Sequence, residues 1–275
     1  MKRSILVPSF VFLFLSCTMD PFLFNSKPAD SYALPGNTIS PELIHEISFN
    51  SGGNTIYGIW VASNGTRPGL TLLYCHGNKH GIDEYWDRVM FLHDIGVNIL
   101  IFDYRGYGKS EGESSESGLH EDGLAALKYI QDHYSVSGDS LILYGYSLGN
   151  VASIYLAAEQ VNPLVLFAEC PFASSTSLTQ GASGLDLPDR WLTDGTYNNA
   201  ELIQYIETHF CLLHGEIDDF VRWKDNGRVV WEGAPDPKEL HLVSGANHTD
   251  IPQTLGMDRY QSLINNTIKS ALQNQ

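Results

Sequence analysis

The sequence predicts an α/β protein in which helices cover both faces of a mostly parallel sheet of about eight strands. Short apolar runs alternate with amphipathic stretches along most of the chain, the pattern of strands joined by crossover helices. The 275 residues, 43% of them hydrophobic, are enough to bury the core of one such domain. The formal net charge of -16 disfavours a nucleic-acid partner, because few cations are present to offset phosphate repulsion.

An antiparallel pair of strands is expected to open the domain. Residues 43–50 and 54–62 alternate apolar and polar side chains, and Ser51-Gly52-Gly53-Asn54 at their junction is typical of a hairpin turn. The next run, residues 70–75, is apolar almost throughout, as in a parallel strand that is buried on both faces. We therefore expect an antiparallel edge beside a parallel centre.

Helices and strands then alternate to the end of the chain. Helices are expected at residues 82–95, 118–134, 151–159, 201–206, 223–231 and 257–272. Strands are expected at residues 97–102, 164–168, 209–213 and 239–243, and in the run that starts at residue 141. The periodicity fails over residues 171–200, where a short insertion after a strand is typical of a lid that lines a pocket.

The N-terminal segment differs in kind from the domain, which is expected over residues 42–275. Met1-Lys2-Arg3 precedes an apolar stretch that is too short to span a bilayer, and small residues follow it. This arrangement predicts a secretory signal over residues 1–17. Residues 18–41, with several prolines, then indicate a tether between the signal and the domain.

The end of the predicted signal indicates where the chain is located. Phe14-Leu15-Ser16-Cys17 resembles a bacterial lipobox, in which the cysteine is lipidated, so Cys17 is the expected lipidation site. The chain is then expected to be a lipoprotein anchored in a membrane of the cell envelope. Plain secretion into the periplasm or medium and an uncleaved anchor are the alternatives.

A strand-to-helix junction at Ser147 carries the first chemical motif. Gly145-Tyr146-Ser147-Leu148-Gly149 follows an apolar run and precedes a helix, which predicts a sharp turn that lifts Ser147 above the sheet. The Leu148 N–H lies at the positive end of that helix, where it can donate to an oxyanion beside the hydroxyl. Ser147 is therefore the candidate nucleophile and Leu148 a candidate oxyanion-hole donor.

A serine nucleophile needs a base and an orienting acid, which are expected in loops after later strands. His248 follows the strand predicted at 239–243 and is the candidate base. Asp218 follows the strand predicted at 209–213 and is the candidate acid. Asp219 competes for that role, because charge arguments do not separate two adjacent carboxylates.

Several other residues near predicted strand ends receive simpler interpretations. The Asn78 N–H, in the turn after residues 70–75, is the second candidate oxyanion-hole donor. His76 and His214 are interpreted as structural hydrogen-bonding groups, and the role of Glu169 is left open. The cysteines show no metal-type spacing such as Cys-x-x-Cys, so they are interpreted as buried thiols and no metal or cofactor is predicted.

Five motifs in this order resemble the α/β-hydrolase superfamily, and within it the serine hydrolases of the abhydrolase-domain type. The motifs are Leu73 through Asn78, Phe102 through Gly112, Gly145 through Gly149, His214-Gly215 with Asp218 and Val221, and Gly245 with His248. The resemblance covers residues 42–272. It implies that Ser147, Asp218 and His248 form a triad and that Asn78 and Leu148 supply the oxyanion hole.

This resemblance also implies an activity. A carboxylesterase- or thioesterase-like enzyme would cleave an ester or thioester of a small-molecule or acylated substrate through an acyl-enzyme. A serine peptidase, a perhydrolase and a non-catalytic binding protein on the same scaffold remain alternatives. Asn150 and Lys79-His80-Gly81 depart from the family pattern and are expected to narrow the acyl side of the pocket.

Overall fold

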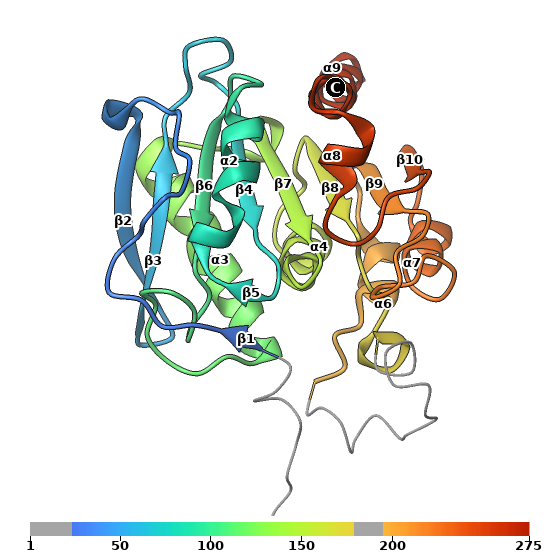
Figure 1. The fold of residues 1–275 in the computed structure, drawn as a ribbon, viewed down its shortest axis with the longest axis horizontal. Helices are drawn as coiled ribbons and strands as arrows, with labels where there is room; N and C mark the ends of the chain where they lie inside the picture. Colours follow the sequence, from blue (N-terminus) through green and yellow to red (C-terminus); the bar gives the residue numbers. More distant parts are fainter. Residues whose placement is uncertain (1–23, 179–194, 275) are drawn as a thin grey trace, which may run out of the picture.

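The predicted sheet forms the centre of the molecule (Figure 1). This computed structural model describes residues 24–178 and 195–274. Eight strands pair in the order β10-β9-β8-β7-β4-β6-β3-β2; the β2–β3 and β3–β6 pairs are antiparallel and the others parallel. The strands are β2 (Ile44–Ser51), β3 (Asn54–Val61), β4 (Thr71–Cys75), β6 (Asn98–Phe102), β7 (Leu141–Tyr146), β8 (Val165–Glu169), β9 (His209–Gly215) and β10 (Lys238–Val243).

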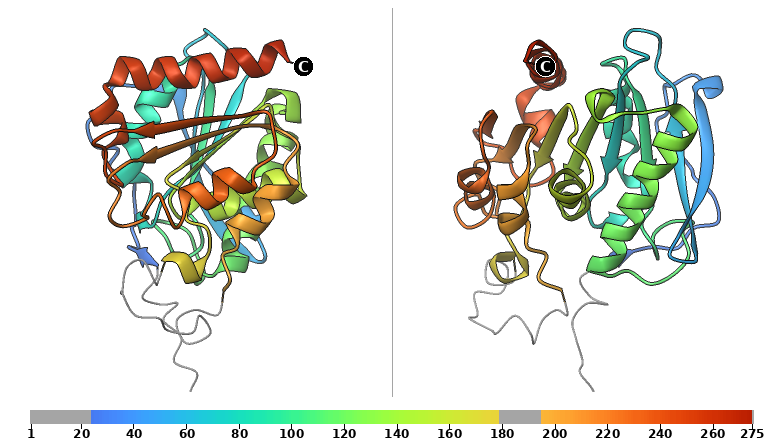
Figure 2. Two further views of the ribbon diagram at one scale, coloured as in Figure 1. Left: turned by 90° about the vertical axis from the view of Figure 1, so that its right-hand side faces the viewer. Right: turned by 180° about the vertical axis from the view of Figure 1, so that it is seen from behind.

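Helices cover both faces of this sheet, as Figure 2 shows from two further sides. The helices are α2 (Trp86–His93), α3 (Glu116–Tyr134), α4 (Gly149–Glu159), α6 (Asn199–Leu202), α7 (Gly227–Gly233), α8 (Ile251–Leu255) and α9 (Met257–Gln273). Apolar side chains of α3, α4 and α7 build a core on one face, and those of α2, α8 and α9 build a second core on the other. The predicted α/β architecture is therefore confirmed.

The central strands explain why the sequence signal is strong. Every residue of β4, β7 and β8 is buried, because helices pack on both sides of these strands. The edge strand β2 instead alternates between more and less exposed positions along most of its length. The continuous apolar runs and the alternating runs of the sequence thus correspond to the centre and the edge of one sheet.

Element boundaries differ from the prediction where local geometry changes. The helix expected at 82–95 begins with a 3-10 turn, Ile82–Tyr85, and its α-helical part ends at His93. The helix expected at 201–206 is divided between α6 and the 3-10 turn Ile203–Tyr205. Two strands of two residues each, β1 (Asn25–Ser26) and β5 (Lys79–His80), pair in parallel. Segments so short carry no periodicity from which to predict them.

Part of the tether predicted over residues 18–41 lies among the described residues. Residues from 24 onward lie along the domain, with the Phe24 side chain buried. The Tyr32 hydroxyl donates to Asp103 Oδ2 at 2.8 Å, and Asp83 Oδ1 accepts from the backbone of Ala33 and Leu34. These polar contacts and the buried ring hold the described part of the segment against the domain.

Other predictions concern parts of the chain outside the described residues. The signal peptide at residues 1–17, with Cys17, is one of them, and most of the lid expected at 171–200 is another. The two ends of that insertion lie together, since Ser175 N donates to Thr196 O and Ala200 N donates to Ala173 O, both at 3.0 Å. Within residues 24–178 and 195–274, no helix is long and apolar enough to cross a bilayer.

One partly buried histidine makes the stability of the fold depend on pH. His120, in α3, stacks on Tyr155 of α4, and burial lowers the pKa of its ring to about 4. The unfolded chain therefore takes up a proton near pH 6.5, whereas the folded chain stays neutral until about pH 4, so stability falls as the pH drops through this window.

The full pKa shift of His120 corresponds to about 3 kcal/mol, which partial exposure of the ring reduces to about 2 kcal/mol. His120→Phe keeps an aromatic ring on Tyr155 but has no group that titrates. Between pH 7 and pH 4 we therefore expect the free energy of unfolding to fall by about 2 kcal/mol more in the wild type than in this variant. Urea unfolding of both proteins at the two pH values measures the difference. Equal losses would contradict the prediction.

Candidate active site

Ser147 lies at the sharp turn between β7 and α4 and has a φ of +50°, which is unusual for a residue with a side chain. Glycine is required on both sides of it. A Cβ at Gly145 would lie 2.2 Å from Ser153 Oγ, and a Cβ at Gly149 would lie 1.9 Å from Cys75 O. The Gly-x-Ser-x-Gly motif therefore allows the strand, the turn and the helix to pack in direct contact.

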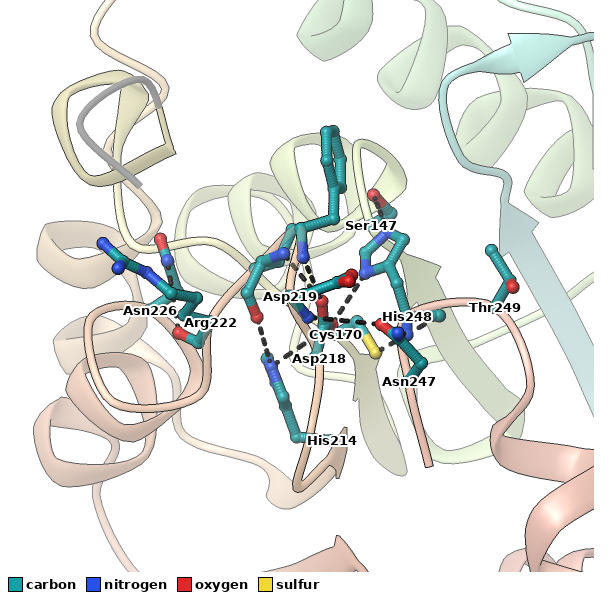
Figure 3. Close-up of polar contacts among 12 residues, drawn as sticks. Ser147, Cys170, His214, Asp218, Asp219, Arg222, Asn226, Asn247, His248 and Thr249 are labelled. Carbon is teal, nitrogen blue, oxygen red and sulfur yellow. Dashed lines mark hydrogen bonds and ion pairs between the residues drawn. The ribbon is translucent and has the colours of Figure 1, made fainter. Parts of the chain in front are cut away.

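The structure brings the three predicted side chains into one hydrogen-bonded line (Figure 3). His248 Nε2 lies 3.0 Å from Ser147 Oγ, and His248 Nδ1 lies 2.8 Å from Asp218 Oδ2. The three residues follow the ends of β7, β9 and β10, which meet at one edge of the sheet. A proton on Nδ1, donated to the carboxylate, leaves the Nε2 lone pair free to accept the serine proton.

The structure distinguishes the two adjacent carboxylates, Asp218 and Asp219, by their burial and contacts. Asp218 is buried, and its Oδ1 accepts from the backbone N–H groups of Phe220 (3.0 Å) and Val221 (2.7 Å), while Oδ2 contacts His248. Asp219 is exposed. Burial raises the pKa of Asp218, but the hydrogen bond and charge of His248 and the Val221 N–H outweigh it, so the pKa falls below its ordinary value. Asp218 is thus ionised at neutral pH.

The turn after β4 lies against the start of α4. A Cβ at Gly149 would lie 2.7 Å from His76 O, so the backbones of the two turns touch. The Asn78 side chain is fixed, because its Oδ1 accepts from Asn25 N at 2.9 Å and from the Tyr107 hydroxyl. The two candidate oxyanion-hole residues, Asn78 and Leu148, therefore belong to neighbouring turns beside Ser147.

Asn150 and Lys79, which were expected to narrow the acyl side of the pocket, each make defined contacts in the structure. Asn150 is fully buried beneath the turn, where its Nδ2 donates to Ser147 O at 3.0 Å and to Glu169 O at 2.9 Å. It ties the strained turn to the end of β8. Lys79 is exposed and forms an ion pair with Glu84 at 2.8 Å. The residue types at these two positions are evident from the sequence, but the directions of their side chains are not.

Glu169, which the sequence leaves without a role, is half of a buried ion pair. Its Oε1 accepts from Arg88 Nη1 at 2.6 Å, and its Oε2 accepts from the hydroxyls of Tyr144 and Tyr260, the latter at 3.0 Å. The Glu169 side chain is fully buried and that of Arg88 is 7% exposed. This pair joins α2 to the end of β8 directly below the candidate site.

The buried pair also supports the loop that carries the base. Arg88 Nη2 donates to Thr249 O at 3.3 Å, and its guanidinium lies over the Tyr146 ring, 4.1 Å from the ring centroid. The Tyr146 hydroxyl in turn donates to His248 O at 3.1 Å. Sequence reasoning missed Arg88, although it lies four residues before Leu92, on the apolar face of α2, where a charged residue signals a buried partner.

Removing one member of the pair should be costly. We expect Glu169→Gln to lower the free energy of unfolding by about 3 to 5 kcal/mol, because it leaves the Arg88 charge buried and unpaired. The double variant Arg88→Met, Glu169→Leu should recover most of that loss, because apolar side chains then replace both buried charges. Urea unfolding of the single and double variants tests this. A double variant less stable than Glu169→Gln would refute it.

Two further histidines are structural, as the sequence suggests. His214 Nε2 contacts Val221 O at 2.7 Å, and burial lowers the pKa of the ring, which stays neutral behind Asp218. His76 Nδ1 contacts Gly77 O at 2.7 Å in the turn after β4. Neither ring reaches Ser147 Oγ, the atom that His248 contacts.

Two apolar side chains near the base are exposed. The Phe220 ring meets the His248 ring edge to face, 5.1 Å between centroids, and 49% of Phe220 is exposed. Ile217, in the same loop after β9, is 58% exposed. Sequence analysis did not select these residues, because an apolar side chain in a loop carries no pattern. Phe220 therefore places an exposed apolar ring directly beside His248.

Known proteins resemble this chain in sequence. A family model described as Chlamydia CHLPS protein (DUF818) matches residues 62–163. The uncharacterized protein YfhR of Escherichia coli (strain K12) is 24% identical over 279 residues, with 98% of this chain and 97% of the relative covered. The uncharacterized protein Rv2307c of Mycobacterium tuberculosis (strain ATCC 25618 / H37Rv) is 32% identical over 189 residues, covering 68% of this chain and 65% of the relative.

Solved structures show the same likeness. An esterase of Pyrococcus furiosus, Pf2001, superimposes with a TM-score of 0.69 at 22% identity, covering 86% of this chain and 95% of that one. An acetyl xylan esterase from Paenibacillus sp. R4 gives 0.69 at 16% identity, with 85% and 86% covered. An alpha-beta hydrolase from Vibrio vulnificus gives 0.66 at 17% identity, with 81% of each chain covered. This chain therefore has the α/β-hydrolase fold.

Proposed function

We propose that this chain is a serine hydrolase that cleaves carboxylic ester or thioester bonds through an acyl-enzyme. The observation that carries the proposal is the line from Asp218 Oδ2 through both nitrogens of His248 to Ser147 Oγ, at 2.8 and 3.0 Å. The likeness to solved esterases supports it. The strained turn at Ser147 supports it as well, because such strain is kept where function requires it.

In the proposed first step, Ser147 Oγ attacks the carbonyl carbon while its proton moves to His248 Nε2. Asp218, ionised behind the ring, stabilises the resulting imidazolium. The N–H groups of Leu148 and Asn78 hold the oxyanion, a contribution of about 3 kcal/mol for one such donor. The imidazolium then gives its proton to the leaving alcohol or thiol, and the acyl group stays on Ser147.

In the second step, a water molecule replaces the leaving group. His248 takes a proton from this water, whose oxygen attacks the acyl carbonyl. The tetrahedral intermediate collapses, Ser147 recovers its proton from His248, and the carboxylic acid leaves. The exposed ring of Phe220 beside His248 suits a substrate with an apolar group next to the scissile bond.

Turnover of small substrates tests this proposal. We expect the purified full chain to hydrolyse p-nitrophenyl acetate and a short acyl thioester, and an active-site-directed fluorophosphonate to abolish both activities. A matched p-nitroanilide tests for a peptidase, which would turn over the amide at a comparable rate. Absence of hydrolysis across the panel, or turnover that survives complete fluorophosphonate treatment, would contradict the proposal.

We also propose that the chain is lipidated at Cys17 and anchored in a membrane of the cell envelope. The support is the lipobox-like Phe14-Leu15-Ser16-Cys17 after an apolar stretch. In bacteria that express the full chain, Cys17→Ala should abolish incorporation of radiolabelled palmitate and release the protein from the membrane fraction. Labelling that persists in Cys17→Ala would contradict lipidation at this residue.

A further inference from the structure

A second group of reactive side chains lies away from the candidate active site, where the edge strand β10 pairs with β9. Cys211 of β9 lies in register with Glu239 of β10, and His241 is two residues further along β10. Side chains two residues apart share a face of the sheet, so thiol, carboxylate and imidazole lie together. Their ligand atoms all lie within 4.8 Å of one another.

We propose that Cys211, Glu239 and His241 form a binding site for a divalent transition-metal ion of the zinc class. A thiolate, an imidazole and a carboxylate are the donor set that zinc and cobalt prefer, whereas magnesium and calcium prefer oxygen alone. His241 Nε2 lies 3.6 Å from Glu239 Oε2. Ligand atoms of a tetrahedral zinc ion lie about 3.5 Å apart, so the carboxylate and imidazole already have the required separation.

His241 Nε2 provides the observation that points to a ligand. This nitrogen is buried, and within the described part of the chain it has no hydrogen-bond partner, although it faces the carboxylate of Glu239. Burying a polar atom without a partner is costly, and a metal ion would accept its lone pair. The thiol of Cys211 is buried next to it. A bound ion would therefore give His241 Nε2 the partner it lacks and would bind the neighbouring Cys211 sulfur at the same time.

Surrounding residues hold the carboxylate in position. Thr267 Oγ1 of α9 donates to Glu239 Oε2 at 2.7 Å and lies 3.8 Å from Cys211 Sγ. His209 Nε2 contacts Glu239 Oε1 at 2.9 Å. Outer hydrogen bonds of this kind orient metal ligands. They keep Glu239 turned toward the thiol instead of toward solvent.

Charge and access also suit a divalent ion. As the metal–sulfur bond forms, Cys211 releases its thiol proton to solvent, so the thiolate and the Glu239 carboxylate together neutralise a charge of 2+. Glu239 and His241 have side chains that are 32% and 34% exposed, which gives the ion a path from solvent and leaves a fourth position for water. The bound ion would fasten the edge strand β10, which leads to the loop of His248.

Cobalt titration tests the site without depending on activity. We expect one equivalent of Co²⁺, added to the chelator-treated full chain, to produce the near-ultraviolet thiolate-to-cobalt absorption and the visible bands of tetrahedral cobalt. Cys211→Ser should abolish the near-ultraviolet band. His241→Ala, a change at a partly exposed position that the fold should tolerate, should weaken cobalt binding at least about tenfold.

Single replacements of the other three cysteines, Cys17→Ser, Cys75→Ser and Cys170→Ser, are the matched controls and should keep the band. Cys170 is the most informative of them, because its thiol lies near Asp218 and His248 of the candidate active site. Absence of the band in the wild type would overturn the proposal. So would a band that survives Cys211→Ser or disappears in Cys170→Ser, or wild-type cobalt affinity in His241→Ala.

Discussion

Ser147→Ala lowers kcat for ester hydrolysis about a millionfold if the proposed mechanism holds, since loss of the nucleophile in enzymes of this kind costs about 10⁶. The Ser147 hydroxyl is the group that His248 Nε2 contacts at 3.0 Å. Without it no acyl-enzyme forms, and only slow attack of water on the bound ester remains. Steady-state turnover of a p-nitrophenyl ester by the two proteins measures the effect.

The matched control is another serine beneath the same turn. Ser153 Oγ is buried and, in the part of the chain that the structure describes, has no hydrogen-bond partner, so Ser153→Ala should keep kcat within about threefold of the wild type. Thermal unfolding of both variants checks that the fold is intact. Comparable turnover by Ser147→Ala and the wild type would contradict the assignment of the nucleophile.

Asp218→Asn should lower kcat by about four orders of magnitude, the effect of the same change in well-studied triads. An amide at this position can donate to His248 Nδ1, so the ring proton moves to Nε2. Once protonated, Nε2 can no longer accept the serine proton. The contacts from Phe220 N and Val221 N to Oδ1 remain available, so the loop should keep its shape. Steady-state kcat at neutral pH is the measurement.

Asp219→Asn is the matched control, because Asp219 is the adjacent carboxylate that competed with Asp218 for the role of the acid. This neighbouring carboxylate is exposed, and its replacement should change kcat less than about threefold. Charge arguments left the choice between the two acids open, and the family resemblance alone favoured Asp218. A large loss in Asp219→Asn together with normal turnover in Asp218→Asn would reverse the assignment.

The sequence predicts a part of the fold well when the same requirement for burial or exposure applies to several consecutive residues. β4 and β7 are apolar throughout because both of their faces are covered, and β2 alternates because it lies at the edge. The turn at Ser147 is predictable for a similar reason, because glycine is required at positions 145 and 149 by backbone contact. Such constraints restrict which residue types can occur, so they can be recognised in the sequence.

A single contact between residues far apart in the chain produces no comparable sequence pattern. The partner of Glu169 is Arg88, 81 residues away, and neither residue lies in a motif. The packing of residues 24–41 likewise uses Asp83 and Asp103, and nothing in the sequence pairs these two acids with that segment. Asn150 shows the same limit within a motif, since its type is evident but its direction beneath the turn is not.

Labelling of the nucleophile tests the central claim most directly. The active full chain is treated with a fluorophosphonate, digested, and analysed by mass spectrometry to locate the modified residue. The mechanism proposed here predicts one phosphonyl group per chain, carried by Ser147. A stable adduct on any other residue, or no adduct in a preparation that hydrolyses esters, would contradict the claim that Ser147 is the nucleophile.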